Sequence, residues 1–222
     1  MPWQPWPYHQ ALLPCRHALP PLSGCCGALK RGIDIAVALI TLLTHLLLLL
    51  VVAIAIKLDS PGPILFCQHR IGLHGRSFKL VKFRTMRHAP HGHGPLCQTC
   101  PHDPRVTRIG ALLRRTSIDE LPQLWNVLRG DMSLVGPRPH APGTCAGSTP
   151  FEQVSDCYGL RHRVRPGMTG LAQVRGWRGQ TDTEEKLLRR LDSDLEYIAT
   201  WSLGMDCLIL LRTVATLWRN AY

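Results

Sequence analysis

A long uncharged hydrophobic segment constrains this chain more than any other feature of its sequence. From Ile35 to Ile56 about 22 consecutive residues carry no formal charge, which is long enough for a helix that crosses a bilayer. Lys30 and Arg31 flank one end, and no face of the segment is polar, so a buried core helix is a poor alternative. A cleaved signal peptide also fits poorly, because the segment is too long and begins about 30 residues into the chain. We therefore expect a hydrophobic membrane helix over 30–58.

The regions on either side of this helix differ in composition. Residues 1–29 are rich in proline and tryptophan, and we expect them to form a poorly ordered leader. Residues 59–222 are long enough for one domain and hold most of the charge of a chain whose net charge is +11. No acidic residue lies between Asp59 and Asp103, where six basic residues accumulate. Such a field attracts phosphate groups, with a solvated basic surface as the alternative, and no nucleic-acid-reading motif accompanies it.

The cysteines do not form a disulfide framework. Nine of them, an odd number without regular spacing, argue against a secreted scaffold and for a reducing compartment. Cys97 and Cys100, with three histidines nearby, allow a zinc hypothesis, but a structural zinc ion needs four ligands and no second pair follows. The glycines and prolines around them favour a loop, so zinc is the weaker alternative.

The pattern after the hydrophobic helix predicts a mostly helical α+β domain. A proline-rich turn at 60–63 leads to short strands near 64–68 and 78–83, which we expect to form a small hairpin. A helix is expected from about 105 to a break at Thr116 and Ser117, and a second one continues to Leu128. The stretch LVGPRPH that follows is a tight loop stiffened by prolines.

Three arginines, Arg161, Arg163 and Arg165, alternate along the chain. An extended segment would place all three on one face. We expect them to contact phosphate groups or a lipid surface, with solvated charge as an equally weighted alternative.

Two amphipathic helices are predicted to close the chain, over 181–203 and 203–220. Their leucines follow helical spacing. Trp201 and Trp218 would lie at a membrane interface if these helices rest on the bilayer. The alternative, that both apolar stripes pack on the core, is equally open.

Asp119 and Glu120 stand side by side, and a structural role is the first explanation to consider. Ser117 as a helix N-cap with Glu120 three residues later would form a capping box, and Asp119 would complement the helix dipole. Many soluble proteins carry that pattern.

The neighbourhood of the acidic pair favours chemistry. Adjacent residues on a helix point about 100° apart, so one carboxylate can attack while the other holds a metal ion. Arg114 and Arg115 would keep Asp119 ionised, as a nucleophile requires, and Arg138 in the stiff loop suits phosphate oxygens. Phosphoryl transfer needs an ionised nucleophile, a divalent ion such as Mg²⁺ and cations around the phosphate.

Five stretches together resemble the bacterial sugar transferases called polyprenyl-phosphate hexose-1-phosphate transferases. They are KLDSPGPILFCQHRIG, FKLVKFRTM, DPRVTRIGALLRRTSIDELPQLWNVLRGDMSLVGPRPH, RHRVRPGMTGLAQVRGW and DLEYI. The likeness runs from about Lys30 to Leu217, and its motifs are long and specific. The stretch GWRGQTDT is most similar to the branch that transfers glucose-1-phosphate or galactose-1-phosphate to start exopolysaccharide synthesis.

The resemblance implies a mechanism and a set of site residues. Asp119 would attack the sugar-proximal phosphate of a UDP-sugar, release UMP and form a covalent phosphosugar-aspartate, from which undecaprenyl phosphate takes the phosphosugar. Glu120 matches the residue associated with Mg²⁺. The expected substrate- or phosphate-binding residues are Arg114, Arg138, Lys82, Arg84 and Asp194, to which the alternating arginines add Arg163.

The resemblance also implies a location, namely the cytoplasmic face of the bacterial inner membrane. Undecaprenyl phosphate stays in the bilayer while the UDP-sugar is cytosolic, so membrane lipid is a further expected partner. The oligomeric state is open, with a homodimer as one alternative. Family members commonly carry Ser-Pro midway through the hydrophobic segment, which turns the helix back into the same leaflet. Thr44 and His45 take that place here, so threonine can bend its own helix but the proline kink is absent. We favour re-entry over spanning because the catalytic domain has to face the cytosolic substrate.

Two other functions stay open. A catalytically silent membrane scaffold would use the basic face to hold lipid or partner enzymes, and a conventional glycosyltransferase would release UDP instead of UMP. No residue indicates which sugar hydroxyl is recognised, so the sequence leaves the sugar undetermined.

Overall fold

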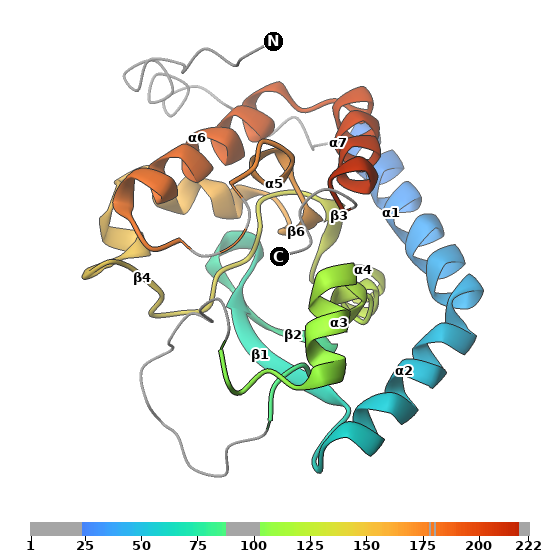
Figure 1. Cartoon of the computed structure of the whole chain (residues 1–222). Coiled ribbons are helices and arrows are strands. Elements are labelled where there is room, and N and C mark those ends of the chain that lie inside the picture. Colours follow the sequence, from blue (N-terminus) through green and yellow to red (C-terminus); the bar gives the residue numbers. More distant parts are fainter. Residues whose placement is uncertain (1–23, 88–102, 178, 180, 218–222) are drawn as a thin grey trace.

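The computed structural model describes residues 24–87, 103–177, 179 and 181–217. The leader up to residue 23, Cys97, Cys100 and Trp218 lie outside the described residues, and so do the predictions about them. Within the described ranges, helices predominate and the strands form three two-stranded sheets, which confirms the mostly helical α+β class (Figure 1).

The elements alternate along the chain, with long helices at both ends. The helices are α1 (Cys25–Thr44), α2 (Leu46–Asp59), α3 (Arg108–Thr116), α4 (Gln123–Arg129), α5 (Leu171–Val174), α6 (Glu184–Thr200) and α7 (Leu203–Leu217). The strands are β1 (Leu65–Ile71), β2 (Ser77–Phe83), β3 (Ser133–Val135), β4 (Cys145–Ala146), β5 (Thr149–Pro150) and β6 (Gly167–Thr169). Short 3₁₀ turns are η2 (Leu73–Gly75), η3 (Ile118–Glu120), η4 (Phe151–Gln153) and η5 (Tyr158–Arg163).

The hydrophobic segment forms two helices, α1 and α2, bent by 63° where they meet at His45 (Figure 1). Thr44 Oγ1 donates to the carbonyl oxygen of Ile40 at 2.9 Å, and His45 Nδ1 lies 3.0 Å from that of Thr41. Such bonds to the preceding turn bend a helix without proline, so the predicted bend is confirmed. No single helix in the described part of the chain is long and apolar enough to cross a membrane, whereas the bent pair taken together has that length and composition.

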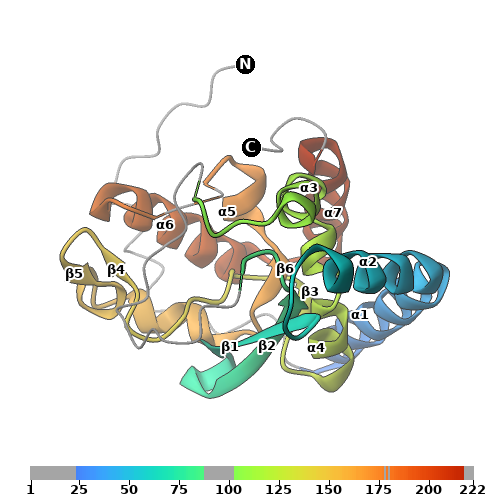
Figure 2. The same ribbon diagram turned by 60° about the horizontal axis from the view of Figure 1, so that its bottom comes forward.

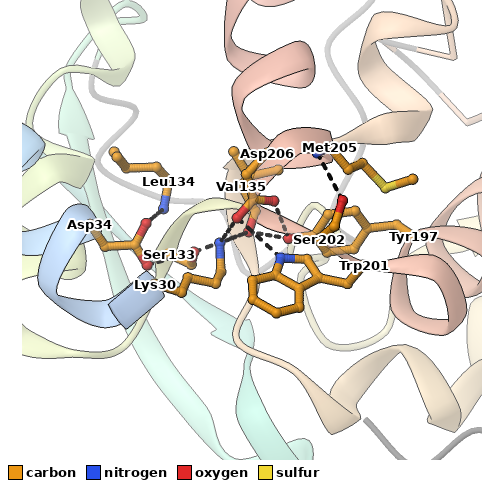
Figure 3. A network of polar contacts seen from close by, with 10 residues as sticks. All are labelled: Lys30, Asp34, Ser133, Leu134, Val135, Tyr197, Trp201, Ser202, Met205 and Asp206. Atoms are coloured by element: carbon orange, nitrogen blue, oxygen red, sulfur yellow. Dashed lines mark hydrogen bonds and ion pairs between the residues drawn. The ribbon is translucent and has the colours of Figure 1, made fainter. Parts of the chain in front are cut away.

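A buried polar network fixes α1 to the C-terminal helix α7 (Figure 3). Lys30 Nζ donates to Asp206 Oδ2 at 2.6 Å and to the carbonyl oxygen of Val135 at 3.2 Å. The Tyr197 hydroxyl and the Trp201 ring nitrogen donate to the Asp206 carboxylate at 2.8 and 3.1 Å. All five residues are at most 9% exposed. We call them the anchor network, and it joins α1, β3, α6 and α7.

Both ends of the bent pair are bound to the same domain. Near the start of α1, Asp34 accepts a hydrogen bond from Ser133 Oγ in β3 at 2.7 Å. At the end of α2, Arg84 donates to the carbonyl oxygen of Ser60 at 2.6 Å. The bend therefore lies farther from the domain than either end, as both views show (Figures 1 and 2).

Helix α6 packs on the core. Its apolar stripe is at most 7% exposed and consists of Leu187, Leu191, Leu195 and Ile198. Trp201, just after the helix, is also buried and belongs to the anchor network. For α6 the core alternative is thus confirmed, and the predicted place of Trp201 at a membrane interface is wrong because its ring nitrogen has a buried partner.

Helix α7 divides its apolar residues between core and surface. Ile209 is 1% exposed and packs in the main core. Leu208, Leu211 and Val214 remain exposed. This helix therefore has both a packed face and an apolar outer face, and its contact with a membrane stays a prediction.

The alternating arginines do not share a face. Arg161 and Arg163 lie in the 3₁₀ turn η5, and Arg165 follows after Val164, whose backbone is extended. Arg161 is 3% exposed, whereas Arg163 and Arg165 are on the surface. The predicted extended segment is wrong because a 3₁₀ turn has about three residues per turn, so alternate side chains diverge.

Candidate active site

The acidic pair lies on a tight turn between two helices. Helix α3 ends at Thr116, and Ser117 adopts the left-handed conformation with φ 57°. The 3₁₀ turn η3 then directs Asp119 inward, where it is 7% exposed, while Glu120 is half-buried. The Ser117 side chain makes no capping bond, so the predicted capping box is wrong: the left-handed backbone replaces an ordinary helix start.

Helix α3, which carries this turn, is fixed against the residues that follow β2. Thr107 caps the helix by accepting from the Gly110 backbone nitrogen at 2.9 Å. A Cβ atom at Gly110 would lie 2.0 Å from the carbonyl oxygen of Thr85, so this approach requires glycine. Arg114 Nε donates to Thr85 Oγ1 at 2.9 Å, which orients its guanidinium beside the acidic pair.

Glu120 is paired with Arg138 from the proline-stiffened loop after β3. Arg138 Nη1 and Nη2 donate to the two carboxylate oxygens at 3.2 and 2.5 Å. This bidentate arrangement is the geometry in which arginine also holds phosphate oxygens. The structure therefore brings together two predicted site residues that are 18 positions apart in the sequence.

The pKa of Asp119 is raised above that of an ordinary aspartate. Burial, and then repulsion from Glu120, raise its pKa from 3.8 to about 6, while Lys82, Arg114 and Arg138 act in the opposite direction. Arg114 acts in the predicted direction by favouring the ionised form, although desolvation outweighs the cations and raises the pKa. A carboxylate with this pKa is largely ionised at pH 7 and more nucleophilic than an ordinary surface aspartate.

The β1–β2 hairpin supplies cations to the acidic turn. In its register Phe66 pairs with Lys82 and Arg70 pairs with Phe78. Directly opposite residues of an antiparallel pair share a face, and residues two positions apart along a strand also share it. Lys82 and Arg70 therefore point to the same side, and burial lowers the pKa of both side chains.

A buried asparagine holds the hairpin at this site. Asn126 in α4 is 0% exposed. Its side chain donates to the carbonyl oxygen of Lys79 at 2.7 Å and accepts from the backbone nitrogen of Val81 at 3.0 Å. These two bonds continue the ladder of β2 and set the position of Lys82, the next residue.

A buried ion pair supports the loop of Arg138. Arg161 Nη2 donates to Asp194 Oδ2 at 2.7 Å and to the carbonyl oxygen of Arg138 at 2.8 Å. Arg161 also contacts His140, and burial together with Arg161 keeps the pKa of His140 well below its ordinary value. Asp194, a predicted site residue, is thereby linked to the acidic turn through Arg161.

The pattern of residues that defines bacterial sugar transferases matches residues 26–220. That stretch contains the acidic turn, the hairpin cations and the loop of Arg138. The chain belongs to the bacterial sugar transferase family.

Three characterised relatives support this membership. The chain is 49% identical over 194 residues to the UDP-glucose:undecaprenyl-phosphate glucose-1-phosphate transferase of Escherichia coli (strain K12), covering 87% of this chain and 41% of that protein. It is 52% identical over 185 residues to the undecaprenyl-phosphate glucose phosphotransferase of Komagataeibacter xylinus, covering 83% and 35%. It is 52% identical over 188 residues to the exopolysaccharide production protein PSS of Rhizobium leguminosarum bv. phaseoli, covering 85% and 94%. The chain thus spans less than half of the first two relatives and nearly all of the third.

Two predicted site residues of this sugar transferase lie away from the acidic turn. Arg84 is 4% exposed and donates to the carbonyl oxygens of Ile56, Ser60 and Pro61, so it holds the end of α2. Arg163 is exposed at the end of η5 and is not among the cations that shift the pKa of Asp119. A phosphate-binding role for either residue stays a prediction that this geometry does not support.

The sequence interpretation missed Arg70 as a site residue of the transferase. The first strand was expected to end at Gln68, which left Arg70 in the turn, whereas β1 continues to Ile71. Gln68 and Arg70 alternate along β1 opposite Leu80 and Phe78, and this pattern could have placed Arg70 on the same face as Lys82. It can be recognised only once the register of the hairpin is known.

Asp119 and Glu120 also provide the chemistry expected for Mg²⁺. In the parts of the chain that the structure describes, no group of three or more His, Cys, Asp or Glu side chains could hold a metal ion. Mg²⁺ in phosphate-transfer sites takes one or two carboxylates and completes its shell with water and substrate phosphates. The adjacent carboxylates, whose mutual repulsion a cation would relieve, fit that requirement.

Proposed function

We propose that this chain transfers a hexose-1-phosphate from a UDP-sugar to undecaprenyl phosphate and releases UMP. The observation that carries the proposal is Asp119, buried on a tight turn beside Glu120 and surrounded by Lys82, Arg114 and Arg138. Two of the relatives are named for transfer of glucose phosphate to undecaprenyl phosphate, which makes UDP-glucose the first donor to test.

Asp119 is the nucleophile in this reaction. One of its carboxylate oxygens forms a bond to the sugar-proximal phosphorus of the donor, and the phosphoanhydride bond to UMP breaks with its electron pair leaving on the UMP oxygen. A phosphate oxygen of undecaprenyl phosphate then attacks the same phosphorus and frees the carboxylate. One phosphoanhydride replaces another, so the overall step is close to isoenergetic.

Without substrate, Glu120 and Arg138 form an ion pair with each other, and this pair occupies the groups that the reaction needs. When a diphosphate enters, Arg138 turns its fork from Glu120 to the phosphate oxygens, a geometry it already adopts toward a carboxylate. Glu120, freed from Arg138, would hold Mg²⁺ beside Asp119, and the bound ion would supply neutralisation of phosphate charge. Lys82 and Arg114 balance the remaining charge from the other side of Asp119.

The bent pair α1–α2 suits a membrane anchor that re-enters one leaflet. Around the bend the apolar side chains of Leu43, Leu46 and Leu47 are 64–74% exposed. Both ends of the pair are held on one domain, by Lys30 and by Arg84. A helix pair held at both ends presents its apex to the bilayer and returns, which keeps the domain at the cytoplasmic surface where donor and acceptor meet.

The products distinguish this function from its alternatives. The purified protein, in detergent with Mg²⁺ and undecaprenyl phosphate, is given a panel of UDP-sugars. We expect UMP from one of them, with UDP-glucose first. UDP as product would make the chain a conventional glycosyltransferase, and no nucleotide from any donor would favour the scaffold.

A further inference from the structure

Arg70 is a half-buried arginine near the acidic turn that has few hydrogen-bond partners. Its Nη2 donates to Gln68 Oε1 at 2.7 Å, and its Nη1 lies 3.4 Å from the carbonyl oxygen of Pro139. Its Nε atom is buried and has no hydrogen-bond partner. None of the ion pairs among the described residues involves Arg70.

Two buried arginines, Arg84 and Arg161, share the unpartnered Nε atom with Arg70 but have better partners for the rest of the guanidinium. Arg84 donates to four oxygen atoms at the end of α2. Arg161 is paired with Asp194. Arg70 has one amide oxygen, one long contact and no carboxylate of its own, although removing a guanidinium from water is costly without an anion.

The neighbours of Arg70 place it close to the acidic turn. It shares a face of the hairpin with Lys82, and its Nη1 contact is the residue after Arg138. Burial and then Arg138 lower the pKa of Arg70 to about 10, while Glu120 acts in the opposite direction. The carboxylate that acts on Arg70 is that of Glu120, which is already engaged by Arg138.

We infer that Arg70 is a phosphate-binding residue, held without an ion-pair partner so that it can bind an anionic phosphate oxygen of a substrate. The inference rests on the proposed function and extends it, because it adds a fourth cation, on the hairpin side, to Lys82, Arg114 and Arg138. The phosphate belongs either to the diphosphate of the UDP-sugar or to undecaprenyl phosphate, since both present the same chemistry.

The test compares Arg70→Gln with Arg76→Gln. Arg76 lies at the exposed tip of the same hairpin and loses the same charge in its variant, so it is a matched control. Steady-state UMP release is measured in detergent while UDP-glucose and undecaprenyl phosphate are varied in turn. Loss of a charge-assisted hydrogen bond predicts a tenfold to hundredfold fall, roughly, in kcat/KM for one substrate in Arg70→Gln and little change in Arg76→Gln. A fall confined to UDP-glucose assigns the donor diphosphate, and one confined to undecaprenyl phosphate assigns the acceptor.

Two further measurements keep the inference independent of turnover and of folding. Inorganic pyrophosphate should raise the unfolding temperature of the wild type and of Arg76→Gln, and less so that of Arg70→Gln. Without ligand, Arg70→Gln should be at least as stable as the wild type, since it removes a half-buried cation that has no ion pair. Arg70→Lys keeps the charge but loses the fork, so its rise in unfolding temperature with pyrophosphate should lie between those of the wild type and Arg70→Gln.

The outcomes separate the inference from the proposed function. Equal kinetics and equal pyrophosphate shifts for the two Gln variants would overturn the inference and leave the function intact. A lower unfolding temperature of Arg70→Gln with unchanged kinetics would also overturn it, in favour of a structural role. Absence of UMP in the wild type would sink the proposed function, while the pyrophosphate shifts would still decide whether Arg70 binds phosphate.

Discussion

Two clusters of buried charge in this molecule are built on opposite principles. In the anchor network one cation, Lys30, meets one carboxylate, Asp206, and every other group donates to that carboxylate or accepts from the cation. Around the acidic turn, cations outnumber carboxylates, and burial disfavours the ionised form of Asp119.

This difference in charge balance distinguishes the anchor network, which stabilises the fold, from the acidic turn, which is suited to binding a substrate. A buried charge with a full set of partners rigidifies the elements that it joins. A buried charge without them is destabilising unless a ligand completes it, and such charges concentrate at functional sites. Lys30 and Asp119 are both 7% exposed, so burial alone does not distinguish the clusters, whereas the balance of charge does.

The largest expected effect is on turnover at the acidic turn. Asp119→Asn removes the nucleophile and should lower UMP release by at least about a thousandfold. Asp156→Asn, at an exposed position, is the matched control and should leave the rate unchanged. Both rates are measured as UMP formed per folded molecule. A rate of Asp119→Asn within tenfold of the wild type would mean that the acidic turn is not the reaction centre.

Breaking the anchor network should cost stability instead of turnover. Lys30→Met leaves the Asp206 carboxylate buried without its cation, which typically costs about 3–5 kcal/mol of unfolding free energy. Lys186→Ala, in the solvent-exposed pair with Asp182, should cost far less stability because water screens that pair. Urea unfolding in detergent, followed by tryptophan fluorescence, measures both. Equal losses in the two variants would show that the buried network is no stronger than a surface pair.

The same Asp119→Asn variant should gain stability at pH 7. Folding raises the pKa of Asp119 from 3.8 to about 6, so stability falls as the pH rises through this window. The ionised carboxylate then costs about 3 kcal/mol at most at pH 7, and the neutral amide avoids that cost. The gain should shrink as the pH falls and vanish below the unfolded-state pKa of 3.8, where the aspartate is neutral in both the folded and the unfolded chain. A variant less stable than the wild type at pH 7 would contradict the view that this cluster is strained for function.

The smallest expected effect is on the pH dependence of the rate. Because the ionised form of Asp119 attacks, a pKa of about 6 predicts that kcat/KM falls about tenfold between pH 7 and pH 5. The profile is measured with UDP-glucose at a fixed excess of undecaprenyl phosphate. A flat profile over this range would indicate that Asp119 titrates like an ordinary aspartate.

Local chemistry made part of this organisation predictable. A bend at Thr44 and His45 was favoured from the sequence, and bonds from these two side chains within one helical turn accompany it. The acidic pair and Arg138 were also expected in one site, although the prediction of Glu120 on a regular helix missed the left-handed Ser117. Motif spacing therefore identified the chemistry better than the backbone that presents it.

The rest depends on long-range packing. The partner of Lys30 lies 176 positions away, and no local pattern pairs them. The raised pKa of Asp119 arises from burial, which competes with arginines that the sequence did show. Arg161 was assigned to a surface because alternation suggested a strand, whereas a 3₁₀ turn buries it against Asp194.

The central claim is that Asp119 carries the phosphosugar covalently, and intact-protein mass spectrometry tests it most directly. The wild type and Asp119→Asn are mixed with UDP-glucose and Mg²⁺ in the absence of undecaprenyl phosphate, and the mass is recorded before and after the acceptor is added. The account predicts one hexose-phosphate adduct on the wild type, mapped to the peptide that contains Asp119, absent from the variant and lost on addition of the acceptor. UMP release without an adduct, or an adduct that persists in Asp119→Asn, would contradict it.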